Sequence, residues 1–233
     1  MLRKRPNSQL GRVRILPGLL ERSAPKPDIY YGAKPSQLDR RVRRDLAGYI
    51  VPSGRSDLPA APNFFLEGKS AAGRADVAQN QAMYDGAVGA RAMLQLQNYG
   101  QPTPRYDGNA YTVTSTYHPG TGTLQMYATH PRPSVAPAGE PQYYMTQLDG
   151  HYMTGTSDNF RKGAAAYRNA RDWTQQQRDR LISGANAVAQ TMSPNIHWRY
   201  DFFQAACLFP ICDITTATLE NVDRIDTAMA QES

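Results

Sequence analysis

The sequence lacks the long apolar run that a membrane-spanning helix needs. It has 233 residues, of which 40% are hydrophobic and 20% are charged, and no stretch of about 18 consecutive apolar residues occurs. The basic N-terminus is not followed by the apolar segment of a secretory signal. We therefore expect no membrane partner and a location inside the cell, in the nucleus or the cytoplasm. The length is enough for one sizeable core.

Cysteine and several common catalytic motifs are also scarce or missing. The two cysteines, Cys207 and Cys212, do not have the spacing of a zinc site, and they are too few for a disulfide framework. The four histidines are scattered along the chain without metal-ligand spacing. Neither glycine-rich phosphate-binding motif is present, and no motif supports a Ser-His-Asp or Cys-His arrangement. The remaining candidates for chemistry are carboxylates and lysines.

Basic residues are concentrated at the start of the chain. The first 44 residues contain 12 Lys and Arg and three acidic residues, whereas the whole chain has a net charge of +6, so the remainder is net negative. A local surplus of this kind is suited to the phosphates of a nucleic acid. A solvated basic tail followed by the exposed face of a helix would give the same pattern. The charge alone leaves both interpretations open.

Periodicity and turn residues predict an α/β (α+β) fold, with a central mixed sheet flanked by helices. The expected strands are 29–31, 62–69, 111–117, 123–129 and 142–148, with a short further strand near 151–154. The expected helices are 36–49, capped by Ser36, then 75–99 and 157–191, with a short helix near 17–22. We divide the chain into a basic, flexible segment 1–24, a domain 25–192 and a C-terminal extension 193–233.

The helix expected at 75–99 has a stripe spaced by three or four residues: Val77, Gln81, Tyr84, Val88, Ala92 and Leu96. Gln81 would lie on this buried stripe, where its amide needs hydrogen-bond partners. Gly86 and Gly89 each weaken a helix by about 1 kcal/mol relative to alanine. We interpret them as positions where the helix packs closely against the sheet.

The most informative stretch is the strand at 62–69, which has an apolar body and a charged end. Side chains alternate along a strand, so Glu67 and Lys69 project to the same face. Charges next to a core cost several kcal/mol unless they are paired or bound to a metal. Asp28 follows Pro27 at the start of the preceding strand, so pairing of the two strands would bring Asp28, Glu67 and Lys69 together. Two such carboxylates can hold Mg²⁺, and the lysine can orient an attacking water.

These residues resemble the PD-(D/E)XK nuclease superfamily. The likeness rests on Pro27-Asp28, on Glu67-x-Lys69 after an apolar strand, and on the following helix with Gln81 and Tyr84, and it covers about residues 26–190. The stretches 26–32 and 62–69 are most similar to uncharacterised fungal domains assigned to that superfamily. Gln81 and Tyr84 are one residue closer together than the glutamine–tyrosine motif of some nuclease branches. Position 68 is glycine where the superfamily usually has an apolar residue.

The resemblance implies a restriction-endonuclease-like sheet and a metal-dependent nuclease. Asp28 and Glu67 would be ligands of Mg²⁺ (or Mn²⁺), Lys69 would be the catalytic lysine, and Gln81 and Tyr84 would support the site or contact the substrate. The expected partner is DNA or RNA. Two alternatives stay open: a catalytically inactive domain of the same fold that binds nucleic acid or protein, and a purely structural interaction domain. The sequence does not predict the oligomeric state.

Overall fold

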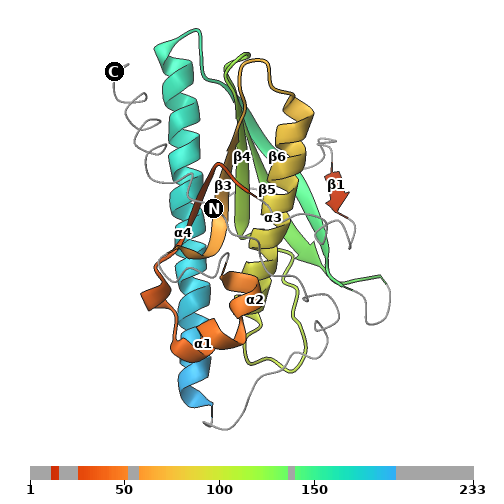
Figure 1. The fold of residues 1–233 in the computed structure, drawn as a ribbon, viewed down its shortest axis with the longest axis vertical. Coiled ribbons are helices and arrows are strands. Elements are labelled where there is room, and N and C mark those ends of the chain that lie inside the picture. The colour runs from red at the N-terminus through yellow and green to blue at the C-terminus, as the bar shows by residue number, and fades with distance from the viewer. Residues whose placement is uncertain (1–11, 16–25, 52–57, 136–139, 193–233) are drawn as a thin grey trace.

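A mixed six-stranded sheet lies between two long helices (Figure 1). The computed structural model describes residues 12–15, 26–51, 58–135 and 140–192. The strands are β1 (Arg12–Ile15), β2 (Ile29–Ala33), β3 (Ala60–Gly68), β4 (Thr112–His118), β5 (Thr123–Arg132) and β6 (Gln142–Tyr152). Their order in the sheet is β1-β6-β5-β4-β3-β2, in which β3 and β4 are parallel and all other neighbours are antiparallel. The α/β architecture predicted from the sequence is confirmed.

The two long helices, α3 (Ala75–Gln97) and α4 (Ser157–Thr191), cover opposite faces of the sheet. Consecutive residues of β3 show this, because they point to opposite faces. The ring of Phe64 packs edge-on against Tyr167 of α4, with 5.0 Å between ring centroids, whereas Phe65 lies against Gly89 of α3. In β3, every residue before Gly68 is buried, as expected for a strand covered on both faces.

The strand predictions hold with shifted ends. The turn at 119–122 joins β4 to β5, and Gly122 adopts a φ of 62°, which favours glycine. The two strands expected at 142–148 and 151–154 are one continuous strand, β6. Strand β1 pairs with β6, so the sheet takes in four residues of the segment 1–24. The helix expected near 17–22, the charges before residue 12 and the extension 193–233 lie outside the described residues.

The single helix expected at 36–49 is wrong. A short 3₁₀ helix (Pro35–Gln37) is followed by α1 (Arg40–Asp45) and α2 (Ala47–Ile50), which break at Leu46. The N-cap of α1 is Asp39 and not Ser36, since its carboxylate accepts a 2.8 Å hydrogen bond from the Arg41 backbone.

Arg41 links this region to the end of α4. Its guanidinium donates to the carbonyl oxygens of Ala189 and Met192, at 3.2 and 2.9 Å, where the helix leaves backbone acceptors without partners. None of the helices within the described ranges combines the length and the hydropathy of a membrane span.

Helix α3 lies directly on the sheet at two glycines, as predicted. A Cβ at Gly89 would come within 2.7 Å of Thr112 Cγ2 and 2.8 Å of a Phe65 ring carbon, and a Cβ at Gly86 would collide with the Thr129 side chain. The helix backbone therefore occupies the space that side chains fill in other helix–sheet contacts.

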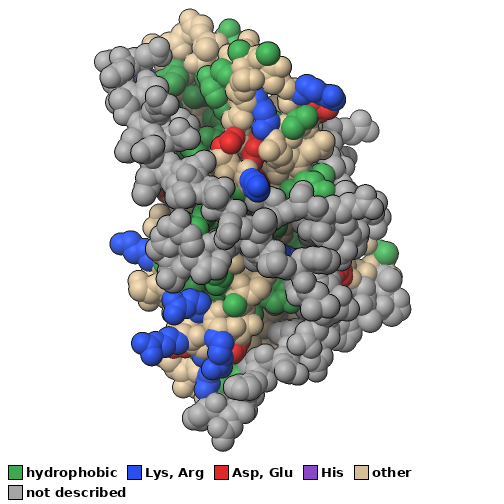
Figure 2. All heavy atoms as spheres, viewed as in Figure 1, with side chains coloured by type: hydrophobic (Ala, Val, Ile, Leu, Met, Phe, Trp, Pro, Cys, Tyr) green, Lys and Arg blue, Asp and Glu red, His purple; other side chains and the backbone are tan. Residues whose placement is uncertain are grey.

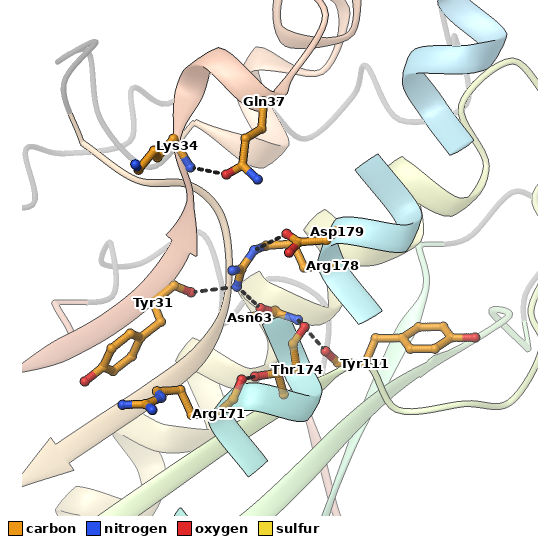
Figure 3. Close-up of polar contacts among 9 residues, drawn as sticks. All are labelled: Tyr31, Lys34, Gln37, Asn63, Tyr111, Arg171, Thr174, Arg178 and Asp179. Carbon is orange, nitrogen blue, oxygen red and sulfur yellow. Dashed lines mark hydrogen bonds and ion pairs between the residues drawn. The ribbon is translucent and has the colours of Figure 1, made fainter. Parts of the chain in front are cut away.

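A buried polar network joins β3 to α4 (Figure 3). Asn63, fully buried, donates from Nδ2 to the carbonyl oxygens of Tyr111 and Thr174, both at 2.8 Å. Its Oδ1 accepts a 2.7 Å hydrogen bond from the buried Arg178 guanidinium, which also makes a long 3.5 Å contact with the carbonyl oxygen of Tyr31. This network supplies partners for a charge that would otherwise be costly inside the protein.

We expect Gly89→Ala to destabilise the protein by about 1–3 kcal/mol, because the added methyl group overpacks the contact with Thr112 and Phe65. Gly184→Ala is the matched control: it lies within α4 with nothing near its Cβ position and should stabilise by up to about 1 kcal/mol. Urea unfolding of the two variants measures both effects. Equal stabilities would contradict the packing role of Gly89.

We expect Asn63→Ala to destabilise by about 3–5 kcal/mol, because it leaves the Arg178 charge buried without its main acceptor. Adding Arg178→Met should recover much of this loss, which a double-mutant cycle of urea unfolding would detect. Arg168→Ala, an exposed arginine on the same helix, serves as the control and should be nearly neutral. Additive single effects would argue against a coupled pair.

Candidate active site

The register of β2 and β3 brings Asp28 to the end of β3. Ile29 pairs with Leu66, and the Asp28 carboxylate Oδ2 accepts a 2.7 Å hydrogen bond from the backbone of Gly68. A Cβ at Gly68 would lie 3.6 Å from this oxygen, which is ordinary contact. The glycine is therefore not required for space, and the apolar residue usual in the PD-(D/E)XK superfamily would meet no close contact at its Cβ.

Glu67 and Lys69 form an ion pair on one face of the chain, as their spacing predicted. Lys69 Nζ lies 3.4 Å from Glu67 Oε2, and the side chains of the lysine and the glutamate are 16% and 1% exposed. The backbone N–H of Lys69 donates to the carbonyl oxygen of Tyr117, 3.1 Å away, so parallel pairing with β4 helps to fix its position. The structure thus brings Asp28, Glu67 and Lys69 together at one end of the sheet.

Sequence reasoning missed a third acidic residue, Asp85 of α3. It is 1% exposed, and its carboxyl lies within hydrogen-bonding reach of the carboxyl of Glu67. Two ionised carboxylates have no proton to share, and within the described residues Glu67 Oε1 and Asp85 Oδ2 have no hydrogen-bond partner. We call Asp28, Glu67 and Asp85 the acidic group.

Burial and neighbouring acidic side chains raise the pKa values of Glu67 and Asp85. Burial raises the pKa of Asp85 well above its usual range, and the adjacent Glu67 charge raises it further. Burial is also the main reason that the pKa of Glu67 is raised, and Asp28 adds to it, while Lys69 acts in the opposite direction. The one ammonium does not offset three carboxylates.

The buried stripe predicted for α3 is confirmed at Ala92 and Leu96, but in the first half of the helix it is wrong by one residue. Its buried face runs through Ala78, Ala82, Asp85 and Gly89, while Val77 is 42% exposed. Gln81 is only half-buried.

Gln81 and Tyr84 nevertheless lie on the part of α3 near the acidic group. Gln81 precedes Asp85 by four residues and so shares its helix face, and its Oε1 has no hydrogen-bond partner among the described residues. Tyr84 is half-buried, and within the described part of the chain no hydrogen bond joins it to Asp28, Glu67 or Lys69.

The acidic group suits a hard divalent cation. Its oxygens are the ligand type that Mg²⁺ prefers, and Mg²⁺ commonly uses one or two carboxylates and keeps several waters. In the described ranges, no three or more His, Cys, Asp or Glu side chains are already arranged around a single metal position. A pair of carboxylates with water is therefore the arrangement that fits. Figure 2 shows acidic side-chain atoms at the surface between α3 and α4, with Lys and Arg atoms on either side.

In metal-free protein, Asp85→Asn should raise the melting temperature at neutral pH by a few degrees, since it removes a buried charge and supplies an N–H for Glu67. A carboxyl whose pKa is raised by folding makes the native state less stable as pH rises above the unfolded pKa near 4. The gap between variant and wild type should therefore widen from pH 5 to 8. Melting curves in EDTA test this, and a gap independent of pH would contradict it.

Comparison with known protein families gives a match over most of the chain. A family model described as a domain of unknown function (DUF7924) matches residues 7–185, which include β1, the acidic group, Lys69 and most of α4. No curated protein and no solved structure matches the chain. Because this match covers more than half of the chain, the chain belongs to the DUF7924 family of domains of unknown function.

Proposed function

We propose that this protein is a metal-dependent nuclease of the PD-(D/E)XK type, which hydrolyses phosphodiester bonds of DNA or RNA. The observation that carries the proposal is the meeting of Asp28, Glu67 and Lys69 at one end of paired strands, with Glu67 buried. A buried carboxylate beside a lysine and a second carboxylate is a typical arrangement for chemistry that needs both a cation and a positioned proton donor.

Each residue has a role in this proposal. Asp28 and Glu67 hold Mg²⁺ or Mn²⁺, for which the unpartnered Glu67 Oε1 is an available ligand. The cation supplies charge stabilisation at the phosphate and lowers the pKa of a bound water. Lys69, held beside Glu67 and only partly exposed, orients the attacking water and faces the developing phosphate charge. Gln81 and Tyr84 support the site or contact the substrate.

The position of the motif in the fold supports the same proposal. In the resemblance to PD-(D/E)XK nucleases, the Glu-x-Lys motif ends a buried strand, and an acidic residue comes from a neighbouring strand. Here β3 lies between β2 and β4, Asp28 precedes β2, and helices cover both faces of the sheet. We therefore propose that the sheet is restriction-endonuclease-like, although architecture by itself does not establish an activity.

The basic residues of α1 lie far from the acidic group. Helix α1 follows the end of β2 that pairs with the start of β3. Glu67 comes seven residues after Ala60 in β3, which places this end roughly 23 Å from Glu67. Arg40 and Arg44 are exposed there, whereas Arg41 binds the end of α4. Figure 2 shows Lys and Arg atoms gathered over this region. In this proposal, Arg40 and Arg44 would contact phosphates about seven base pairs from the cleaved bond.

We expect Glu67→Gln and Lys69→Ala each to reduce Mg²⁺-dependent cleavage at least about 100-fold while leaving the fold intact, because each removes one part of the catalytic arrangement. The measurement is cleavage of single- and double-stranded DNA and RNA, with EDTA as the metal-free control. Lys162→Ala is the matched lysine control, since it removes only an exposed ion pair with Asp158.

Mg²⁺-dependent cleavage that is unchanged in both site variants would overturn the proposal. Wild-type protein that cleaves none of the substrates but binds them in a salt-sensitive way would instead support the inactive nucleic-acid-binding alternative.

A further inference from the structure

Asp85 is not part of the motif on which the proposed function rests, yet it is among the most buried charged side chains of the described chain. It is 1% exposed, it comes from α3 and not from the strands, and its Oδ2 has no hydrogen-bond partner within the described residues. Burying a carboxyl without compensation costs several kcal/mol. Its position next to Glu67 therefore calls for a compensating group.

The protein supplies too little compensation by itself. The cation whose charge acts on both buried carboxyls is Lys69, and its Nζ contacts Oε2 of Glu67. Glu67 Oε1 and Asp85 Oδ2 are left as adjacent acceptors without a donor. Gln81 Oε1, one helical turn from Asp85, is a third acceptor without a partner. Glu67 and Asp85 are two buried carboxyls in reach of one another, each with an oxygen that has no donor within the described residues, and a single cation could satisfy both oxygens.

We propose that Asp85 and Glu67 together bind the divalent cation, so that α3 contributes a ligand in addition to the strands. Asp28 completes the acidic group, directly or through a water, with the oxygen that does not accept from Gly68. The cation class is Mg²⁺ or Mn²⁺, as the all-oxygen donor set indicates. This inference rests on the proposed function in one respect only: both assume that the site binds the same divalent cation.

The packing of α3 gives this ligand a fixed position. Gly86, the next residue, lies against Thr129, and Gly89 lies against Thr112 and Phe65, so the helix cannot turn Asp85 toward solvent without losing these contacts. A bound cation would then connect α3 to β3 across the sheet surface. Cation binding should consequently stabilise the folded protein, which gives a measurement that does not depend on catalysis.

The experiment is titration of the full chain with Mn²⁺. Calorimetry measures the affinity, and the melting temperature with and without Mn²⁺ measures the stabilisation. Wild-type protein should bind one Mn²⁺ and melt at a higher temperature when it is saturated. Asp85→Asn should weaken binding at least about tenfold and lose most of the Mn²⁺-dependent increase, although it folds at least as well without metal. Asp85→Glu, which keeps the carboxylate, should recover part of the affinity. Asp76→Asn, an exposed acid on the same helix, is the matched control and should bind as wild type does.

The outcomes separate this inference from the nuclease proposal. If Asp85→Asn binds Mn²⁺ with wild-type affinity, or if wild type binds none, Asp85 is not a ligand and the inference is overturned. Cleavage retained by an Asp85→Asn variant of unchanged affinity would leave the nuclease proposal standing. Conversely, another outcome is a wild-type protein that binds Mn²⁺, loses this binding in Asp85→Asn, and cleaves no nucleic acid. That result would support the inference and overturn the nuclease proposal.

Discussion

The direct contact between the backbone of α3 and the sheet is the constraint on which the candidate site depends. Without side chains at Gly86 and Gly89, the helix approaches β3, β4 and β5 closely enough that threonine side chains lie against its backbone. This close approach fixes the face that α3 presents to the end of β3. Asp85, immediately before Gly86, is thereby buried beside Glu67 and cannot extend into water. The chemistry of the acidic group is thus a consequence of helix–sheet packing, and a looser contact would leave two separate surface carboxylates.

The elements with strong periodicity could be predicted from the sequence. The face that the first half of α3 buries could not, because the large residues of that helix do not lie on it. The two long helices, the hairpin and the buried strand before Glu67 follow from period and turn chemistry. In α3, however, the buried face is built from alanine and glycine, so the stripe defined by Val77 and Tyr84 was shifted by one residue. A signal was present: Ala78, Ala82, Asp85 and Gly89 have helical spacing, but an acidic residue within such a series is normally assigned to solvent.

The region between β2 and β3 shows a different limit of sequence reasoning. Ser36 follows a proline and looks like a helix cap, but the helix starts four residues later, because Asp39 caps α1 instead. The arginine-rich sequence also left open that these arginines form the exposed face of a helix. In the fold, Arg41 is used to satisfy carbonyl groups at the end of α4, nearly 150 residues away along the chain. Such a role depends on where two distant segments meet, and no local pattern encodes it. The strand register that joins Asp28 to Glu67 was predictable because the two strands are consecutive.

The two sites where charge is buried differ in a way that bears on function. Arg178 is surrounded by acceptors: the Asn63 amide oxygen, a backbone carbonyl, and Asp179 at 3.8 Å from Nε. The fold there supplies acceptors for the Arg178 charge, although its Nε has no hydrogen-bond partner within the described residues. At Glu67 and Asp85, by contrast, the fold places two carboxyls beside each other, and the nearby cation is Lys69. Both sites contact the same strand, β3, and they differ in sign: the buried guanidinium faces acceptors, whereas each buried carboxyl faces another carboxyl. The cation proposed for the acidic group would supply the donor-side partner that its carboxyls lack within the described residues.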